Sequence, residues 1–134
     1  PRHEGGVVIY GDASGSRRQT TGHSDYEMVR QSLATSGHKQ ASYRIPRSNP
    51  EVRERVNLVN ACLRLSEGET RLLIHPRCKE LILDLEQVAY KPGSTVIDKE
   101  RDPRRTHLSD ALGYLIWQEC RPQGRAGART ERIL

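Results

Sequence analysis

The first apolar stretch of the chain is short and continuous, and a carboxylate follows it. Residues 7–10 read Val-Val-Ile-Tyr, and Gly11, Asp12 and three small residues come next. A continuous apolar run of this length predicts a central strand over 6–12, covered on both faces. Asp12 is therefore a candidate functional residue, with a turn-capping role as the alternative.

Later apolar residues recur at helical spacing in four stretches, three of which follow a start signal. Ser24 is expected to cap a helix that ends before Gly37, and Asn49 to cap one that begins at Pro50. Thr106 is expected to cap the last helix. The four predicted helices cover 25–36, 50–63, 78–88 and 107–120.

Two further apolar stretches, 41–46 and 70–76, each end at a proline and predict short strands. The order strand–helix–strand–helix–strand–helix–helix predicts an α/β fold with a mainly parallel or mixed central sheet flanked by helices. In such sheets the working groups collect at the carboxyl ends of the strands, and Asp12 is expected there.

The 134 residues suit one domain, which we assign to 1–120, followed by a basic, flexible tail at 121–134. The start at Pro1 suggests a domain excised from a longer protein. The formal net charge of +5 favours a polyanionic partner. No stretch approaches the roughly 20 apolar residues that cross a bilayer.

The three cysteines form no C-x-x-C pair, which argues against a zinc site. Cys62 and Cys78 lie in apolar runs and are expected to be small buried residues in a reducing compartment.

Asp110 is a second acid in apolar surroundings, within the last predicted helix. His107, Asp110 and Tyr114 share a face of that helix, and Gly113 allows another backbone to come close. A carboxylate packed over a sheet needs a partner, because burying it alone is costly. A divalent cation or an arginine would serve.

Four segments together resemble one protein family. They read VVIYGDASGS, NPEVRERVNLVNACL, LLIHPRCKELILDLEQV and DKERDPRRTHLSDALGYLIW, within residues 6–118. They resemble the C-terminal nuclease domain of phage large terminases, the DNA-packaging motors, and most closely those of headful-packaging, short-tailed phages. The resemblance implies a ribonuclease H-like fold and metal-dependent cleavage of double-stranded DNA with two Mg²⁺ or Mn²⁺ ions.

By this resemblance Asp12 and Asp110 would be catalytic metal ligands. The family has a further acid, often at the end of the neighbouring strand, but Arg47 and Asn49 stand there. Asp25 is the preferred third ligand, although an acid in a first helical turn also stabilises the helix dipole. Glu51 and Glu54 are the next choices.

Basic residues lie on both sides of the two acids. The candidate DNA-binding residues are Arg17, Arg18, Lys99, Arg104 and Arg105, with ordinary solvated loop charges as the alternative.

His107 and Asp84 each have more than one candidate role. His107 could orient Asp110 or assist proton transfer, or it could be an ordinary first-turn residue. Asp84 is assigned to a solvated helix face or a surface salt bridge.

The expected function is therefore a Mg²⁺- or Mn²⁺-dependent endonuclease. The resemblance implies a portal protein and a small terminase subunit as partners, an N-terminal ATPase part of the same polypeptide, and the cytoplasm of an infected bacterium. A non-catalytic module that docks on DNA or a portal, with the acids in salt bridges, is one alternative. Another ribonuclease H-like nuclease, such as a junction resolvase, is the second.

Overall fold

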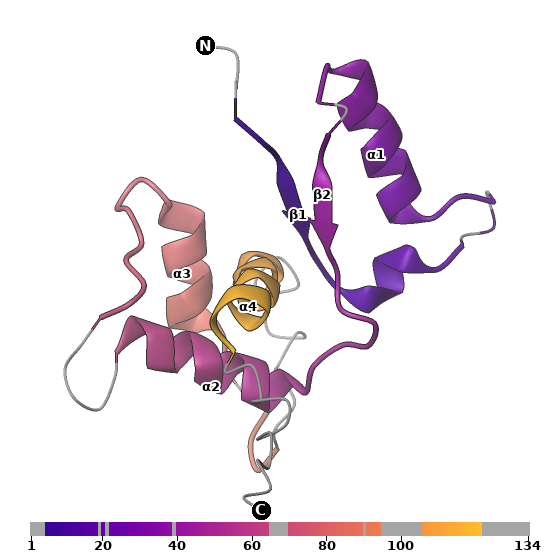
Figure 1. Cartoon of the computed structure of the whole chain (residues 1–134). Coiled ribbons are helices and arrows are strands. Elements are labelled where there is room, and N and C mark those ends of the chain that lie inside the picture. Colours follow the sequence, from indigo (N-terminus) through magenta and orange to yellow (C-terminus); the bar gives the residue numbers. More distant parts are fainter. Residues whose placement is uncertain are drawn as a thin grey trace, which may run out of the picture.

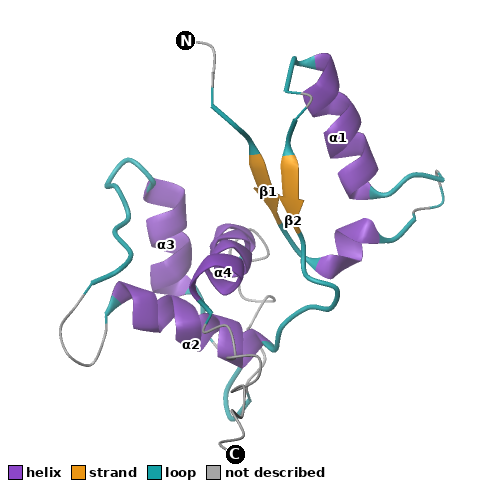
Figure 2. Cartoon of the chain, in the orientation of Figure 1, coloured by secondary structure: helices purple, strands orange, loops and turns teal. Residues whose placement is uncertain are grey.

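The computed structural model describes residues 5–18, 20, 22–38, 40–64, 70–89, 91–94 and 106–121. In chain order this part contains β1 (Val8–Tyr10), the 3-10 helix η1 (Ala13–Ser16), α1 (Asp25–Thr35), β2 (Ser42–Arg44), α2 (Val52–Leu63), α3 (Lys79–Gln87) and α4 (His107–Cys120), as Figures 1 and 2 show. The predicted domain of 1–120 and tail of 121–134 stay untested, since 122–134 lie outside the described residues.

Strands β1 and β2 form a two-stranded parallel sheet in which Val8, Ile9 and Tyr10 face Ser42, Tyr43 and Arg44. The chain between them runs through η1 and α1, so the unit is a β-α-β crossover. Helix α1 lies on one side of the strands and α4 on the other (Figure 1). The predicted α/β class is confirmed, but the sheet is much smaller than expected.

Residues 70–76 do not form the predicted strand. The amides of Arg71 and Leu72 both donate to the carbonyl of Cys62, where α2 ends, instead of to a strand. Leu73, the residue after Leu72, is 85% exposed. The expectation that the first strand is covered on both faces is also wrong, because Val8 is 39% exposed.

Helix α4 is the centre of the packing, and it contacts α2, α3 and β1. In the described part, the fully buried apolar residues are Val59, Cys62 and Ile116, from α2 and α4. Such a small core leaves much of the placement of α4 to polar contacts. Cys62 is buried as predicted, whereas Cys78 is exposed at the start of α3.

One carboxylate, that of Glu119, joins the C-terminal end of α4 to both strands. The Tyr10 hydroxyl donates to Oε1 of Glu119 at 2.8 Å, and Arg44 forms an ion pair with the same oxygen. Since Tyr10 and Arg44 are paired across the sheet, this contact sets α4 over the two strands.

The predicted cap residues are right in position for two helices and wrong for one. Ser24 caps α1 as predicted, and Glu27 completes a reciprocal capping box with it. Thr106 occupies the N-cap position of α4 as predicted, although its side chain makes no capping hydrogen bond. Asn49 is not the cap of α2, because Glu51 occupies that position.

Asp84 caps α4 from the neighbouring helix α3. It is only 2% exposed, so its assignment to a solvated face is wrong. Its Oδ1 accepts from the Thr106 amide at 2.5 Å, and its Oδ2 accepts from the Ser109 amide at 2.7 Å. The first amides of a helix lack partners within the helix, and Asp84 supplies these acceptors. Thr106, whose amide is one of the two donors, has a positive φ of 97°. A charged side chain of α3 therefore fixes where α4 begins.

Of the described helices, none is long and apolar enough to traverse a bilayer.

Replacing Asp84 with Asn should lower the free energy of unfolding by about 2 kcal/mol, because an amide keeps one acceptor and loses the charge. Urea unfolding followed by circular dichroism measures this change. Glu86→Gln, on an exposed position of the same helix, is the matched control and should change stability by less than about 0.5 kcal/mol. Equal stability of the two variants would contradict the capping role.

Candidate functional site

Asp12 lies two residues after the end of β1, at the carboxyl end of the parallel pair, where the sequence places it. Its Oδ1 accepts from the Ser14 amide at 2.6 Å, from the Ser14 hydroxyl and from the Gly15 amide at 3.2 Å. Asp12 therefore caps η1, which is the turn-capping role that the sequence offers as the alternative. All of these bonds converge on one carboxylate oxygen, so they fix the orientation of the group.

Residues from two other segments also form hydrogen bonds with the backbone at and after Asp12. The Tyr26 hydroxyl of α1 donates to the Asp12 carbonyl at 2.7 Å, and the Ala13 amide donates to Oδ1 of Asn49 at 2.7 Å. Gly11 is required here, because a Cβ atom at this position would collide with the Tyr26 hydroxyl. Asn49 follows β2, so the position where a third carboxylate is expected does lie beside Asp12, but it carries an amide.

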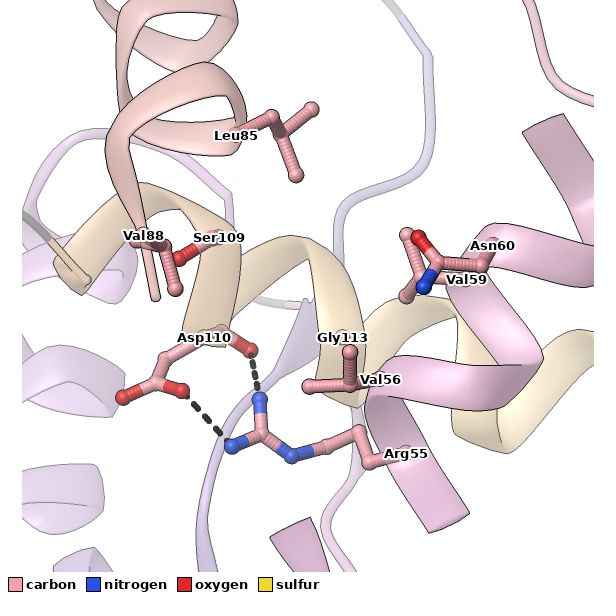
Figure 3. A pocket seen from close by; sticks show the side chains of 9 residues that line it. All are labelled: Arg55, Val56, Val59, Asn60, Leu85, Val88, Ser109, Asp110 and Gly113. Atoms are coloured by element: carbon pink, nitrogen blue, oxygen red, sulfur yellow. Dashed lines mark hydrogen bonds and ion pairs between the residues drawn. The ribbon is translucent and has the colours of Figure 1, made fainter. Parts of the chain in front are cut away.

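Asp110 lies in the first turn of α4 and is held by Arg55 of α2. The guanidinium donates to Asp110 Oδ1 at 2.6 Å and to the Asp110 carbonyl at 3.0 Å, as Figure 3 shows. The Arg55 side chain is 5% exposed and that of Asp110 is 22% exposed. The structure thus supplies an arginine, one of the two partners that the sequence allows, for Asp110.

The residues after Asp110 make room for this cation. A Cβ atom at Gly113 would lie 2.5 Å from Nη1 of Arg55, so the glycine admits a side chain rather than the backbone that the sequence suggests. The guanidinium also lies 4.5 Å from the ring centre of Tyr114, in a cation–π contact.

Asp12 and Asp110 belong to one electrostatic cluster. The hydrogen bond from the Ser14 hydroxyl holds the pKa of the Asp12 carboxyl below its ordinary value, and the charge of Arg55 lowers it further. Burial raises the pKa of the Tyr114 phenol; Arg55 opposes that rise, and the carboxylates of Asp12 and Asp110 add to it. Two acids far apart in the sequence therefore act on the same two side chains, Arg55 and Tyr114.

The other predicted acids are less closely connected to the cluster of Asp12, Asp110, Arg55 and Tyr114. Asp25 opens α1 and raises the pKa of the Tyr26 phenol, after larger effects of burial, Asp12 and Tyr114. Glu51 and Glu54 are exposed at the start of α2.

The predicted basic residues and His107 are placed as follows. His107 is exposed at the start of α4, and Arg17 and Arg18 are exposed just after η1. Lys99, Arg104 and Arg105 lie outside the described residues.

The described residues hold no group of three or more His, Cys, Asp and Glu side chains arranged for a metal ion. Asp12 and Asp110 nevertheless have the chemistry of a hard-cation site, because Mg²⁺ is bound by one or two carboxylates together with water and substrate phosphates. The hydrogen bonds that Asp12 accepts from the η1 loop all use Oδ1. A cation that bound Asp110 would lie beside Arg55, a charge of the same sign.

A cavity of about 220 Å³ adjoins the ion pair between α2, α3 and α4 (Figure 3). Beside Arg55 and Asp110, its lining is mixed: Val56, Val59, Leu85 and Val88 are apolar, and Asn60 and Ser109 are polar.

Sequence reasoning missed Arg55, although a signal was present. Val52, Arg55 and Val59 follow one another at spacings of three and four, so Arg55 falls within the apolar stripe of α2. A charge at such a position indicates a buried partner.

Comparison with known proteins gives no relative: no family model, no curated protein and no solved structure matches the chain.

Ser14→Ala should raise the pKa of the Asp12 carboxyl toward its ordinary 3.8, because it removes the strongest hydrogen bond to the carboxylate. Carbon-13 NMR of the carboxyl group across an acid titration measures the midpoint. The folded pKa is depressed, so this contact stabilises the fold fully above pH 3.8 and the stabilisation is lost as pH falls through the folded value. Ser16→Ala, exposed in the same 3-10 helix, should leave the midpoint unchanged. If the Asp12 carboxyl titrated with the same midpoint in Ser14→Ala and Ser16→Ala, the Ser14 hydroxyl would not be the cause of its lowered pKa.

Proposed function

We propose that the chain is a metal-dependent nuclease domain of the phage large-terminase type, which cleaves double-stranded DNA. The observation that carries the proposal is the shared environment of Asp12 and Asp110 around Arg55 and Tyr114. The order of the four terminase-like segments and the position of Asp12 at the carboxyl end of β1 support it.

The finer fold in this proposal is ribonuclease H-like. An apolar groove runs between β1, α3 and α4 and is lined by Val8, Ile9, Tyr10, Leu81, Leu108, Ala111, Leu112 and Leu115.

Asp12 and Asp110 would hold the divalent cations, which supply a Lewis acid for the phosphodiester and an activated water. The chain's own residues orient the two carboxylates. The η1 amides and Ser14 hold Asp12, while Arg55 holds Asp110. The exposed Arg17 and Arg18 would bind backbone phosphates without reading sequence.

The portal protein, the small terminase subunit, an N-terminal ATPase part and the cytoplasm of an infected bacterium belong to the same proposal, through the terminase resemblance alone. The ion pair of Arg55 with Asp110 favours one second candidate, a non-catalytic docking module in which the acids serve as salt bridges.

Asp12→Asn and Asp110→Asn should each reduce cleavage of plasmid DNA in Mg²⁺ or Mn²⁺ by about a hundredfold or more, because each removes a metal ligand. Gel analysis of nicked and linear products over time measures the rate. Glu86→Gln, exposed on α3, should cleave like the unchanged chain. DNA binding without metal-dependent cleavage would favour the docking module, and preference for four-way junctions over linear duplex would favour a resolvase.

The same assay ranks the third acid. Asp25→Asn is expected to impair cleavage more than Glu51→Gln or Glu54→Gln, because only Asp25 shares the Tyr26 environment with Asp12.

Joint replacement of Arg17 and Arg18 with Gln should weaken DNA binding and reduce the slope of log affinity against log salt by about 2, one phosphate contact for each residue. Fluorescence anisotropy with a labelled duplex at several salt concentrations gives the slope. Arg77→Gln, exposed before α3, is the control and should leave it unchanged. An equal slope in all three proteins would show that these arginines are only solvated loop charges.

A further inference from the structure

Two of the three cysteines lie near the C-terminal ends of two helices that pack against each other. Cys62 is in the last turn of α2, and Cys120 is the last residue of α4. Figure 1 shows these helices in the part of the fold where they are in contact. Both thiols are free; Cys62 is 5% exposed, whereas Cys120 is exposed. This helix pair therefore carries one buried thiol and one accessible thiol.

The packing of α4 directs Cys120 toward Cys62. Ile116 belongs to the buried cluster that contains Cys62, and Cys120 follows Ile116 by one helical turn, on the same face of α4. A helical side chain leans toward the N-terminus and covers the preceding turn. The Cys120 thiol is therefore directed at the turn of Ile116, the residue that packs with Cys62.

The electrostatics of Cys62 agree with this placement. Burial raises the pKa of the Cys62 thiol most, and the Cys120 side chain raises it further, both as a charge and as a hydrogen-bond partner. A hydrogen-bond partner acts only at short range. The charge of Arg71 opposes the rise and so favours the thiolate form of Cys62.

The backbone on each side of the pair is suited to a covalent bond. The amides of Arg71 and Leu72 both donate to the Cys62 carbonyl, so the end of α2 is held in place. Cys120 ends its helix, where the last carbonyls lack partners within the helix. The end of α4 can therefore adjust to the narrow geometry that a disulfide requires.

We propose that Cys62 and Cys120 are a redox-sensitive pair, which a low-molecular-weight disulfide such as oxidised glutathione converts into a disulfide bond between the C-terminal ends of α2 and α4. The inference goes beyond the proposed function and does not depend on it, because neither a metal nor DNA takes part. In a reducing compartment both thiols stay reduced, so the bond forms only when the surroundings become oxidising. Its formation joins the two helices that also carry the ion pair of Arg55 with Asp110.

The bond forms in two exchange steps. The accessible Cys120 thiolate attacks oxidised glutathione, which forms a bond between Cys120 and glutathione and releases one glutathione thiolate. The Cys62 thiolate then attacks the Cys120 sulfur, and the second glutathione thiolate leaves. The two protons that the cysteines lose are taken up, through solvent, by the two glutathione thiolates. The cysteines thus lose two electrons, and one glutathione disulfide gains them.

Mass spectrometry of the 134-residue chain tests the pairing. The reduced protein is incubated with oxidised glutathione under native conditions, the remaining thiols are blocked with N-ethylmaleimide, and the chain is digested with trypsin without reduction. We expect the peptide of residues 56–64, which contains Cys62, to be joined to the peptide of residues 106–125, which contains Cys120. Cys78→Ser, at the start of α3, should form the same bond. Cys120→Ser should leave Cys62 as a free thiol, because burial protects it.

The same reaction in urea is the control for the fold. In an unfolded chain, loop closure favours the cysteines that are closest in sequence, so Cys62 should pair with Cys78 more often than with Cys120. In the folded protein the pairing with Cys120 should exceed that with Cys78 by about tenfold or more, because the fold holds the two thiols together. Similar yields of both pairings, a lasting glutathione adduct on Cys120 beside a free Cys62, or the absence of the joined peptides would each overturn the proposal.

Thermal unfolding gives a second measurement. The oxidised chain should have a Tm at least about 5 °C above that of the reduced chain, because the bond restricts the unfolded state over a long loop. Dithiothreitol should remove the difference, and Cys120→Ser treated in the same way should show none. A Tm that stays equal or falls on oxidation would show that the fold does not position the two sulfurs for bonding, and this would also overturn the proposal.

Discussion

The contact on which most of this structure depends is the ion pair between Arg55 and Asp110. It joins α2 to α4, and α4 in turn contacts α3 and β1. Few apolar residues in the described part are buried, so hydrophobic burial alone does little to fix the position of α4. Polar groups supply it, since Asp84 fixes the start of the helix and Glu119 fixes its end over the strands. Breaking a buried pair by removing one partner is strongly unfavourable, because the other charge then stays behind without compensation.

The same contact links fold and chemistry. Asp12 is oriented by its own loop, within a few residues of chain, whereas Asp110 is oriented by a side chain from a different helix. Local bonds therefore fix one acid, and the tertiary fold fixes the other. The influence of both acids on Tyr114 depends on that tertiary arrangement.

The sequence predicts features whose causes are local. Ser24 caps α1 as predicted, with a bond to a residue only three positions along the chain. Prediction from the sequence fails where a partner far along the chain decides the local structure. The stretch 70–76 has the composition of a strand, but pairing needs a neighbour, and the amides of Arg71 and Leu72 turn to Cys62 instead.

Arg55 and Asp84 share a pattern that sequence reading should weigh more heavily. Arg55 stands between Val52 and Val59, and Asp84 stands between Leu81 and Val88, each at spacings of three and four on an apolar stripe. Both prove to be among the most buried residues described. The sequence alone could not assign their partners, because Asp110 and the Thr106 amide lie far along the chain.

Gly113 has a consequence for the geometry of the helix pair. The distance between two packed helices is ordinarily set by the volume of the apolar side chains at their contact. Here α4 presents a bare backbone at residue 113, and the Arg55 side chain fills the gap, with its Nη1, Cγ and Cδ atoms nearest. The spacer between α2 and α4 is thus one charged side chain, so the thickness of an arginine sets the separation of these helices at this point.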